Sequence, residues 1–295
     1  MNLCARLLNR LQFAANRWII KAATSLINTI MDVSGVDPGT IMYQRYGIMK
    51  WHEYESGELW FLRECLRSIL ADIDEPVLLD VGANSGNYSL ELVEAIPGSR
   101  CYALEPNPLV YDELVLRVSE NSRVVPINYG ASGRPSQSTL YVHGGHPETE
   151  HGSLYREVFT DMHKDDKPVK VSCKFDRIDR LLLTRCIPED VIHFIKVDTE
   201  GHELEALKGA VRTIQNPNLR VIQFEFNEMN VVSRVFLKDF YDLLGDEWSF
   251  YRLDSNCLHP LGIYDSANEI FKYQNIIAIN LGRLSSMTVE KLRLS

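Results

Sequence analysis

Short apolar runs alternate along the chain with longer segments in which apolar residues recur at helical spacing. The apolar runs cover residues 77–81, 101–104, 123–127, 191–197 and 219–226. Helical spacing extends over residues 86–96, 108–120, 203–214 and 235–244. Because strands alternate with helices, the pattern predicts an α/β fold with a parallel sheet and helices on both faces. In such a sheet, ligands bind beyond the carboxyl ends of the strands.

Four more apolar runs depart from this simple alternation. Residues 139–142 and 169–172 are expected to pair as two strands around a polar loop at 143–168. The loop is longer than a routine connection, so it is a candidate lid or acceptor-binding insertion. It contains His143, His146, His151 and His163, whose spacing matches no well-defined zinc site. Residues 248–251 and 275–279 are expected to end the sheet with an antiparallel addition.

The first 31 residues carry four basic side chains, Arg6, Arg10, Arg17 and Lys21, and no acidic one. Their apolar residues recur at roughly helical spacing, which predicts an amphipathic helix. Two interpretations fit it: peripheral contact with a membrane surface, or packing against protein, either the rest of the chain or a homodimer partner. Lys21 interrupts the longest apolar run, which disfavours a membrane-spanning helix. No A-x-A-like site follows a compact apolar segment, which disfavours a secretory signal.

These patterns also predict where the segments of the chain begin and end. Residues 58–70 show one more helical stripe, and Asp74-Glu75-Pro76 closes this section before the first strand. We therefore expect a helical extension over residues 1–75, an α/β domain over residues 76–282 and a tail over residues 283–295.

Composition narrows the class of partner. The chain has 295 residues, of which 45% are apolar and 24% charged, as is ordinary for a globular protein. A net charge of −9 argues against a nucleic-acid partner, because such proteins usually show a basic footprint. The six cysteines are scattered and form no C-x-x-C pair, which indicates a reducing compartment and a cytoplasmic protein.

The most informative motif is the turn after the first strand, Asp80-Val81-Gly82-Ala83-Asn84-Ser85-Gly86. Glycines let a ligand approach the backbone, and the start of the next helix offers N–H donors. The second apolar run ends in Glu105, where βαβ nucleotide-binding units place the acid that binds a ribose.

Two cofactors compete for this turn. A dinucleotide fingerprint needs glycines where the chain has Asn84 and Asn87, so that match is poor. S-adenosylmethionine has a ribose and no pyrophosphate, and it suits the turn and Glu105 better. Asp80 would lie near the ammonium group of the ligand or organise the loop, while Glu105 would accept hydrogen bonds from the ribose hydroxyls. Because we expect the turn at the surface, Gly82→Arg should abolish binding without unfolding the protein.

Three blocks together resemble the FkbM family of S-adenosylmethionine-dependent methyltransferases. They are Leu79 to Gly86, Leu104 to Pro108, and Ile195-Lys196-Val197-Asp198-Thr199-Glu200-Gly201-His202-Glu203 continuing to Ala210. The similarity covers roughly residues 50–230. It implies a Rossmann-like class I methyltransferase fold, with a mostly parallel seven-stranded sheet and an antiparallel final hairpin. It also implies O-methylation of a hydroxyl group on a sugar, glycolipid or related small molecule.

The resemblance and the strand ends together suggest site residues. Cofactor contacts are expected from Asp80, Gly82, Asn84, Gly86, Glu105, Asn107 and Asn128. Candidates for the base that takes the hydroxyl proton are Asp198, Glu200, His202 and Glu225. Glu200 and Glu203 would alternatively cap the next helix. Asp198 and Glu225 could share a proton, hold a base or bind a divalent cation, although the sequence does not predict a metal.

Three other functions stay open from the sequence. One is a catalytically inactive cofactor-binding or scaffold protein of the same fold, and another is an NAD-dependent oxidoreductase. The third, an N-methyltransferase or protein methyltransferase, ranks lower because the chain has no Asn/Asp-Pro-Pro-aromatic motif.

Overall fold

The structure is a computed structural model that describes residues 3–35, 37–50, 53–143, 152–162, 167–184 and 191–294. Contacts divide the chain into two units, Met1–Tyr46 and Gly47–Ser295. The first unit consists of α1 (Leu3–Ser34) and α2 (Pro38–Arg45), so the predicted N-terminal helix is present. No helix of the described ranges combines the length and apolarity needed to cross a membrane.

The boundary between the units lies after Tyr46, whereas the sequence placed it at residue 75. The reason is packing, because the segment before the first strand belongs to the core of the second unit. Phe61, Leu62 and Leu66 are fully buried in the same apolar cluster as Leu78. This segment contains α3 (Glu53–Ser56), α4 (Glu58–Trp60), the π-helical turn η1 (Phe61–Leu66) and α5 (Arg67–Ile69).

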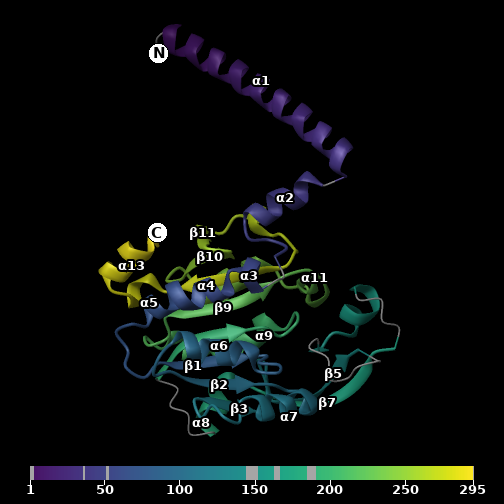
Figure 1. The fold of residues 1–295 in the computed structure, drawn as a ribbon, viewed down its shortest axis with the longest axis vertical. Helices are drawn as coiled ribbons and strands as arrows, with labels where there is room; N and C mark the ends of the chain where they lie inside the picture. Colours follow the sequence, from purple (N-terminus) through teal and green to yellow (C-terminus); the bar gives the residue numbers. More distant parts are fainter. Residues whose placement is uncertain are drawn as a thin grey trace. The chain divides into compact units, whose positions relative to one another are not determined.

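The second unit is built on an eight-stranded sheet (Figure 1). Its order is β11 (Cys257–Pro260), β10 (Ser249–Asp254), β12 (Gln274–Ile279), β9 (Val221–Phe226), β8 (Ile192–Val197), β1 (Val77–Val81), β2 (Arg100–Leu104) and β3 (Val124–Ile127). Strands β3, β2, β1, β8 and β9 pair in parallel, and β12, β10 and β11 pair antiparallel. The predicted fold class is confirmed. The eighth strand, β11, was not expected, and it forms because the chain folds straight back on β10.

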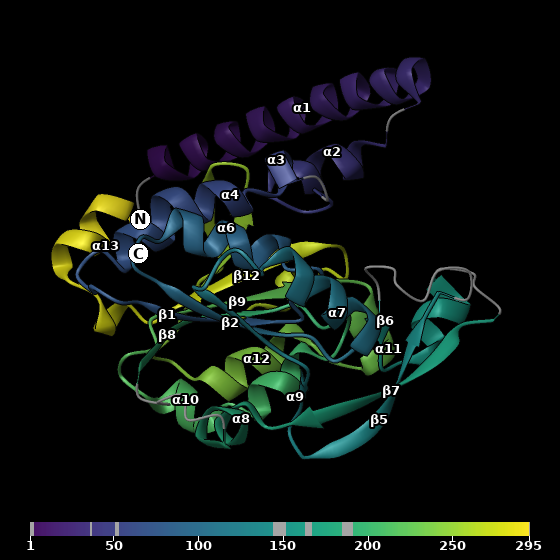
Figure 2. The same ribbon diagram turned by 60° about the horizontal axis from the view of Figure 1, so that its bottom comes forward.

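Alternating side chains of the strands feed two apolar cores, one on each face of the sheet. Leu78 belongs to one core and Leu79 to the other, as the twofold period of a strand requires. The first core also holds helices α6 (Asn87–Ala95) and α7 (Pro108–Arg117). The second core holds α8 (Ile178–Thr184), α9 (Glu203–Lys208), α10 (Val211–Gln215) and α12 (Leu237–Leu244), on the opposite side of the sheet (Figure 2).

Several short helical elements were missed from the sequence, among them α2, α8, α11 (Met229–Ser233) and α13 (Ser286–Leu292). The expected helix at 203–214 is divided at Gly209 and Ala210, and Gly209 packs against the backbone of Ser132. A Cβ at Gly209 would lie 2.3 Å from the carbonyl oxygen of Ser132.

A second sheet extends from one side of the main sheet (Figure 2). It contains β4 (Gly130–Ala131), β7 (Val169–Asp176), β5 (Ser136–Val142) and β6 (Gly152–Ser153), in that order. The antiparallel pairing of β5 with β7 confirms the predicted strand pair. His146, His151 and His163 lie outside the described residues. His143 is described, and its ring makes an edge contact with Phe159 at 5.1 Å between centroids.

Candidate active site

A cavity of about 570 Å³ opens at the carboxyl ends of β1, β2, β8 and β9. Its size is in the range of ordinary small-molecule sites. Eight of the predicted site residues line it: Gly82, Asn84, Glu105, Asn107, Asp198, Glu200, His202 and Glu225. Gly152 and Leu154, from the predicted insertion, also line it. The strand ends and the insertion therefore meet at one cavity, as the sequence suggested.

The glycine turn is shaped by the neighbouring strand end as well as by the cavity. Gly82 has φ +84°, and a Cβ there would lie 1.7 Å from the carbonyl oxygen of Asp198. The expectation that Gly82→Arg would leave the fold intact is therefore wrong, because any side chain at this half-buried position collides with backbone. Because Gly82 has no side chain, the turn after β1 and the turn after β8 can approach each other closely.

Three predicted cofactor residues do not line the cavity. Asp80 is fully buried, and its carboxylate accepts a hydrogen bond of 2.6 Å from Ser89 Oγ. Gly86 begins α6 with φ +89°, and a Cβ there would lie 2.5 Å from Leu114 of α7. Asn128 donates to the carbonyl oxygens of Glu105 and Pro106. These three residues do not line the cavity, and their packing and hydrogen bonds stabilise the loops that surround it.

Glu105 is at the cavity wall and is 7% exposed. Its carboxylate accepts hydrogen bonds from the backbone N–H of Asn84 at 3.0 Å and of Asn107 at 2.8 Å. Burial raises the pKa of Glu105 to about 7, although these two hydrogen bonds oppose the shift. The Asn107 side chain accepts from Leu109 N and so caps α7. Glu105 thus joins the glycine turn to the start of α7.

Asp198, at the end of β8, forms an ion pair of 2.9 Å with Lys196. Lys196 is 6% exposed. It was not predicted as a site residue, although a lysine within the apolar run Ile195-Lys196-Val197 is unusual enough to indicate one. Burial opposes its charge, but Asp198, Asp80, Glu58 and Glu225 outweigh this effect and raise the pKa of Lys196. Lys196 is therefore a buried cation shared by several carboxyl groups.

A chain of hydrogen-bonded polar side chains, of which Gln223 and Asn275 are buried, extends from this cation. The ring centroid of Tyr88 lies 4.5 Å from Lys196 Nζ, and the Tyr88 hydroxyl donates to Gln223 Oε1 at 2.6 Å. Gln223 donates in turn to Glu58 at 2.9 Å and to Asn275 at 3.1 Å. Strands β9 and β12 and helix α4 are linked through these bonds.

Glu225 of β9 lines the cavity and is 9% exposed. Burial, together with the negative charges of Asp198 and Glu200, raises its pKa well above the ordinary value. Asn227 donates to its carboxyl group at 3.3 Å. Glu225 therefore holds its proton more tightly than an exposed glutamic acid does, and it lines the same cavity as Asp198.

The turn after β8 is organised by Glu203. One carboxylate oxygen accepts from the backbone N–H of Thr199 at 2.9 Å and of Gly201 at 3.0 Å. These N–H groups belong to the turn before α9, so Glu203 stabilises that turn, whereas the N-cap residue His202 makes no side-chain hydrogen bond to the helix. Burial raises the pKa of Glu203 to about 7.

The insertion is tied to the same turn by two hydrogen bonds. Ser153 Oγ donates to the carbonyl oxygen of Glu200 at 2.8 Å, and Tyr155 OH lies 3.3 Å from His202 Nδ1. The other ring nitrogen of His202 lies 3.1 Å from Ser132 Oγ. Burial lowers the pKa of His202 to about 4, so the imidazole is neutral at pH 7.

Comparison with known proteins connects this geometry to a family. The sequence matches the methyltransferase FkbM domain over residues 80–246, more than half of the chain. The chain belongs to the FkbM methyltransferase family. The FkbM match includes the glycine turn, Glu105, Asp198 and Glu225, and it confirms the resemblance found in the sequence.

Two relatives of the FkbM chain have similar sequences. It is 27% identical over 183 residues to the hexuronic acid methyltransferase AglP of Haloferax volcanii, covering 56% of this chain and 66% of the relative. It is 31% identical over 162 residues to the methyltransferase sdnD of Sordaria araneosa, covering 45% of this chain and 60% of the relative. The chain thus spans less than two thirds of either protein.

Solved structures share more distant similarity with this FkbM chain. An O-methyltransferase from Bacillus cereus in complex with SAH has a TM-score of 0.43 at 14% identity, covering 87% of this chain and 97% of that one. A putative O-methyltransferase from Klebsiella pneumoniae has a TM-score of 0.41 at 11% identity, covering 87% and 96%.

Proposed function

We propose that this protein is an S-adenosylmethionine-dependent O-methyltransferase acting on a hydroxyl group of a sugar, glycan or related small molecule. The observation that carries the proposal is the position of Glu105 in one cavity with Asp198 and Glu225. The cofactor supplies an electrophilic methyl group when bound. The protein must align the acceptor oxygen with that methyl group and take its proton.

The cavity wall fits the ribose of such a cofactor. A carboxylate has about four lone-pair sites, and the backbone N–H groups of Asn84 and Asn107 use two of those of Glu105. The remaining sites can accept from ribose hydroxyls on the cavity side. Gly82 and Asn84 would form the floor beneath the cofactor.

Asp198 and Glu225 divide the remaining work between a base and a donor. Asp198 lies at the cavity and is paired with Lys196 at 2.9 Å, and in this proposal it accepts the proton of the acceptor hydroxyl. Burial raises the pKa of Glu225, which favours its protonated form, and this form donates a hydrogen bond to another oxygen of the acceptor.

A sugar or glycan acceptor is supported by the relative from Haloferax volcanii, whose name describes a hexuronic acid methyltransferase. The polar lining of the cavity, including Asn227, Glu228 and His202, suits an acceptor with several hydroxyl groups. A divalent cation is not needed for these steps.

Calorimetric titration with S-adenosylhomocysteine and with NAD tests the proposal against its alternatives. We expect stoichiometric binding of the first ligand and none of the second. Glu105→Gln keeps the size of the side chain but replaces one accepting oxygen with an NH₂ donor that cannot accept from Asn84 N or Asn107 N, so we expect at least about tenfold weaker binding. Glu94→Gln, an exposed position on α6, is the matched control.

Outcomes of this titration separate the functions. Binding of NAD alone would support the oxidoreductase. Binding of the methyl donor with no transfer to any of a panel of hexuronic acids, hexoses and glycolipids would support the inactive scaffold. Unchanged affinity in Glu105→Gln would exclude the ribose role.

Peripheral contact of the first unit with a cytoplasmic membrane surface is a further part of this proposal. In the sequence, Arg6, Arg10, Arg17 and Lys21 recur at intervals of four and seven residues, which is the spacing expected for one face of a helix. Within the first unit, the apolar side chains of Trp18, Ile19 and Leu26 remain exposed. A basic stripe with a separate apolar face is typical of helices that lie in a membrane interface. A homodimer stays a prediction from the sequence.

A further inference from the structure

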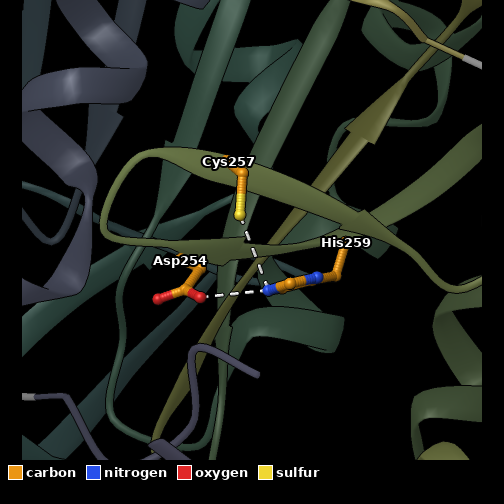
Figure 3. Close-up of side chains that lie close together, drawn as sticks. All are labelled: Asp254, Cys257 and His259. Carbon is orange, nitrogen blue, oxygen red and sulfur yellow. Dashed lines mark hydrogen bonds and ion pairs between the residues drawn. The ribbon is translucent and has the colours of Figure 1, made fainter. Parts of the chain in front are cut away.

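A second cluster of reactive side chains lies on the β10–β11 hairpin, and none of its members lines the cavity. The ligand atoms of Asp254, Cys257 and His259 all lie within 4.8 Å of one another (Figure 3). Asp254 and Cys257 are direct partners in the antiparallel register, and His259 follows Cys257 by two residues. Because side chains alternate along a strand, the register places all three on one face of the hairpin.

The distances within the cluster match those between ligands of one tetrahedral metal ion. His259 Nε2 lies 3.0 Å from Asp254 Oδ2 and 3.6 Å from Cys257 Sγ. With the usual Zn–N, Zn–O and Zn–S bond lengths, tetrahedral angles give about 3.3 Å between nitrogen and oxygen and about 3.6 Å between nitrogen and sulfur. The side chains need only small movements to accept such an ion.

Hydrogen bonding through His259 Nε2 uses only two of these three groups at a time. The Nε2 atom of a neutral imidazole either carries one hydrogen or offers one lone pair. If it donates to the Asp254 carboxylate, it cannot accept from the Cys257 thiol. If it accepts from the thiol, its lone pair faces a carboxylate oxygen at 3.0 Å. A cation between the three atoms removes this conflict.

We propose that Asp254, Cys257 and His259 form a binding site for a divalent metal ion of borderline softness, of which Zn²⁺ fits best. One oxygen, one nitrogen and one sulfur ligand leave the fourth tetrahedral position for water. On binding, Cys257 gives up its thiol proton to solvent and bonds the metal as a thiolate.

The surroundings of the carboxylate support a ligand role for Asp254. Lys50 Nζ contacts Oδ1, and the backbone N–H of Ser255 donates to the same atom at 2.7 Å, so Oδ2 is the oxygen that faces His259. Carboxylates that bind metals are usually oriented by such outer hydrogen bonds. Gly57 brings the preceding segment close, because a Cβ there would lie 1.9 Å from the carbonyl oxygen of Asp254.

Titration of the metal-free, full-length protein with Co²⁺ tests the site by absorption. We expect one equivalent to produce thiolate-to-cobalt charge transfer and the visible bands of a tetrahedral ion, both removed by excess Zn²⁺. In Cys257→Ser the charge-transfer band should disappear. In His259→Gln the affinity should fall at least tenfold. Cys173→Ala, which removes a buried thiol of β7, is the matched control and should behave as the wild type.

Thermal unfolding adds a readout that is independent of cobalt. Zn²⁺ should raise the Tm of the wild type and of Cys173→Ala, because a ligand that binds only the folded state stabilises it. It should leave the Tm of Cys257→Ser unchanged. The proposal is overturned if the wild type shows no charge-transfer band, if Cys257→Ser keeps it, or if the band is lost in Cys173→Ala instead.

Discussion

Burial sorts the carboxyl groups of the candidate active site into two kinds. Asp198 is ion-paired with Lys196 and partly exposed, whereas Glu225 is buried among other acids. We propose that the first group accepts the proton of the acceptor hydroxyl and that the second donates a hydrogen bond, because burial raises the pKa of Glu225. Within the described ranges, Lys196 is the buried lysine that distinguishes the two strand ends, since it pairs with Asp198 at 2.9 Å.

Asp198→Asn removes the proposed base while preserving its shape. We expect kcat to fall about 10²- to 10⁴-fold, the usual contribution of a general base, while the affinity for S-adenosylhomocysteine changes little. Steady-state kinetics and calorimetry on the same preparation separate the two effects. Asp246→Asn, at an exposed position, serves as control. A kcat within threefold of the wild type would assign the base to another residue, with His202 next in line.

Glu203 gives the folded protein a pH dependence of known sign. Its pKa is about 7 in the folded state and 4.5 ordinarily, so the folded protein holds a proton that the unfolded chain has lost between those values. The free energy of unfolding should therefore fall as pH rises through this window, by roughly 3 kcal/mol from this group.

Glu203→Gln keeps an oxygen that can accept from the backbone N–H groups of Thr199 and Gly201, and it removes the titratable carboxyl group. Urea unfolding at about pH 5 and about pH 8 should show that the wild type loses stability relative to this variant as pH rises. Parallel changes in both proteins would assign the pH dependence to other groups.

The insertion between β5 and β7 is an element whose contacts connect two parts of the site. Ser153 and Tyr155 bond to Glu200 and His202, while Gly152 and Leu154 line the cavity. Because these bonds reach the turn after β8 and not the glycine turn, the element is placed to affect the acceptor more than the cofactor.

The double variant Ser153→Ala, Tyr155→Phe should loosen this element. We expect KM for the acceptor to rise severalfold, because two hydrogen bonds of about 1 kcal/mol each are lost, with the S-adenosylhomocysteine affinity unchanged. Glu157→Ala, an exposed residue of the same element, controls for general disturbance. A loss of cofactor affinity in the double variant would instead make the insertion part of the cofactor site.

Elements with strong periodicity were predictable from the sequence, and those set by tertiary contacts were not. Strand 77–81 was predicted to the residue, because its apolar run ends sharply in the glycine turn. Strand β11 was missed because Cys257–Pro260 has no apolar alternation and is held by pairing with β10. Most predicted site residues line the cavity, since strand ends follow from the pattern. Lys196 was missed because its role depends on acids from four separate segments.

At the scale of the whole molecule, charge is distributed unevenly between the two units. The chain carries a net charge of −9, yet its first 31 residues hold four basic side chains and no acidic one. An anionic membrane repels an acidic protein, so attachment would depend on the basic, amphipathic first unit, and the protein would attach through that unit. Attachment would bring the cavity-bearing unit to acceptors that carry lipid anchors.

Sedimentation of the full-length protein with anionic and with neutral vesicles tests this attachment. We expect binding to vesicles rich in phosphatidylserine and much weaker binding to phosphatidylcholine. Arg17→Gln with Lys21→Gln should weaken binding to the anionic vesicles on the order of tenfold, because each basic residue near the surface contributes about 1 kcal/mol. Lys170→Gln with Lys174→Gln removes the same charge from exposed positions on β7 and should change little. Equal losses in both variants would show only a general charge effect, and no preference for anionic vesicles would instead favour packing of α1 against protein.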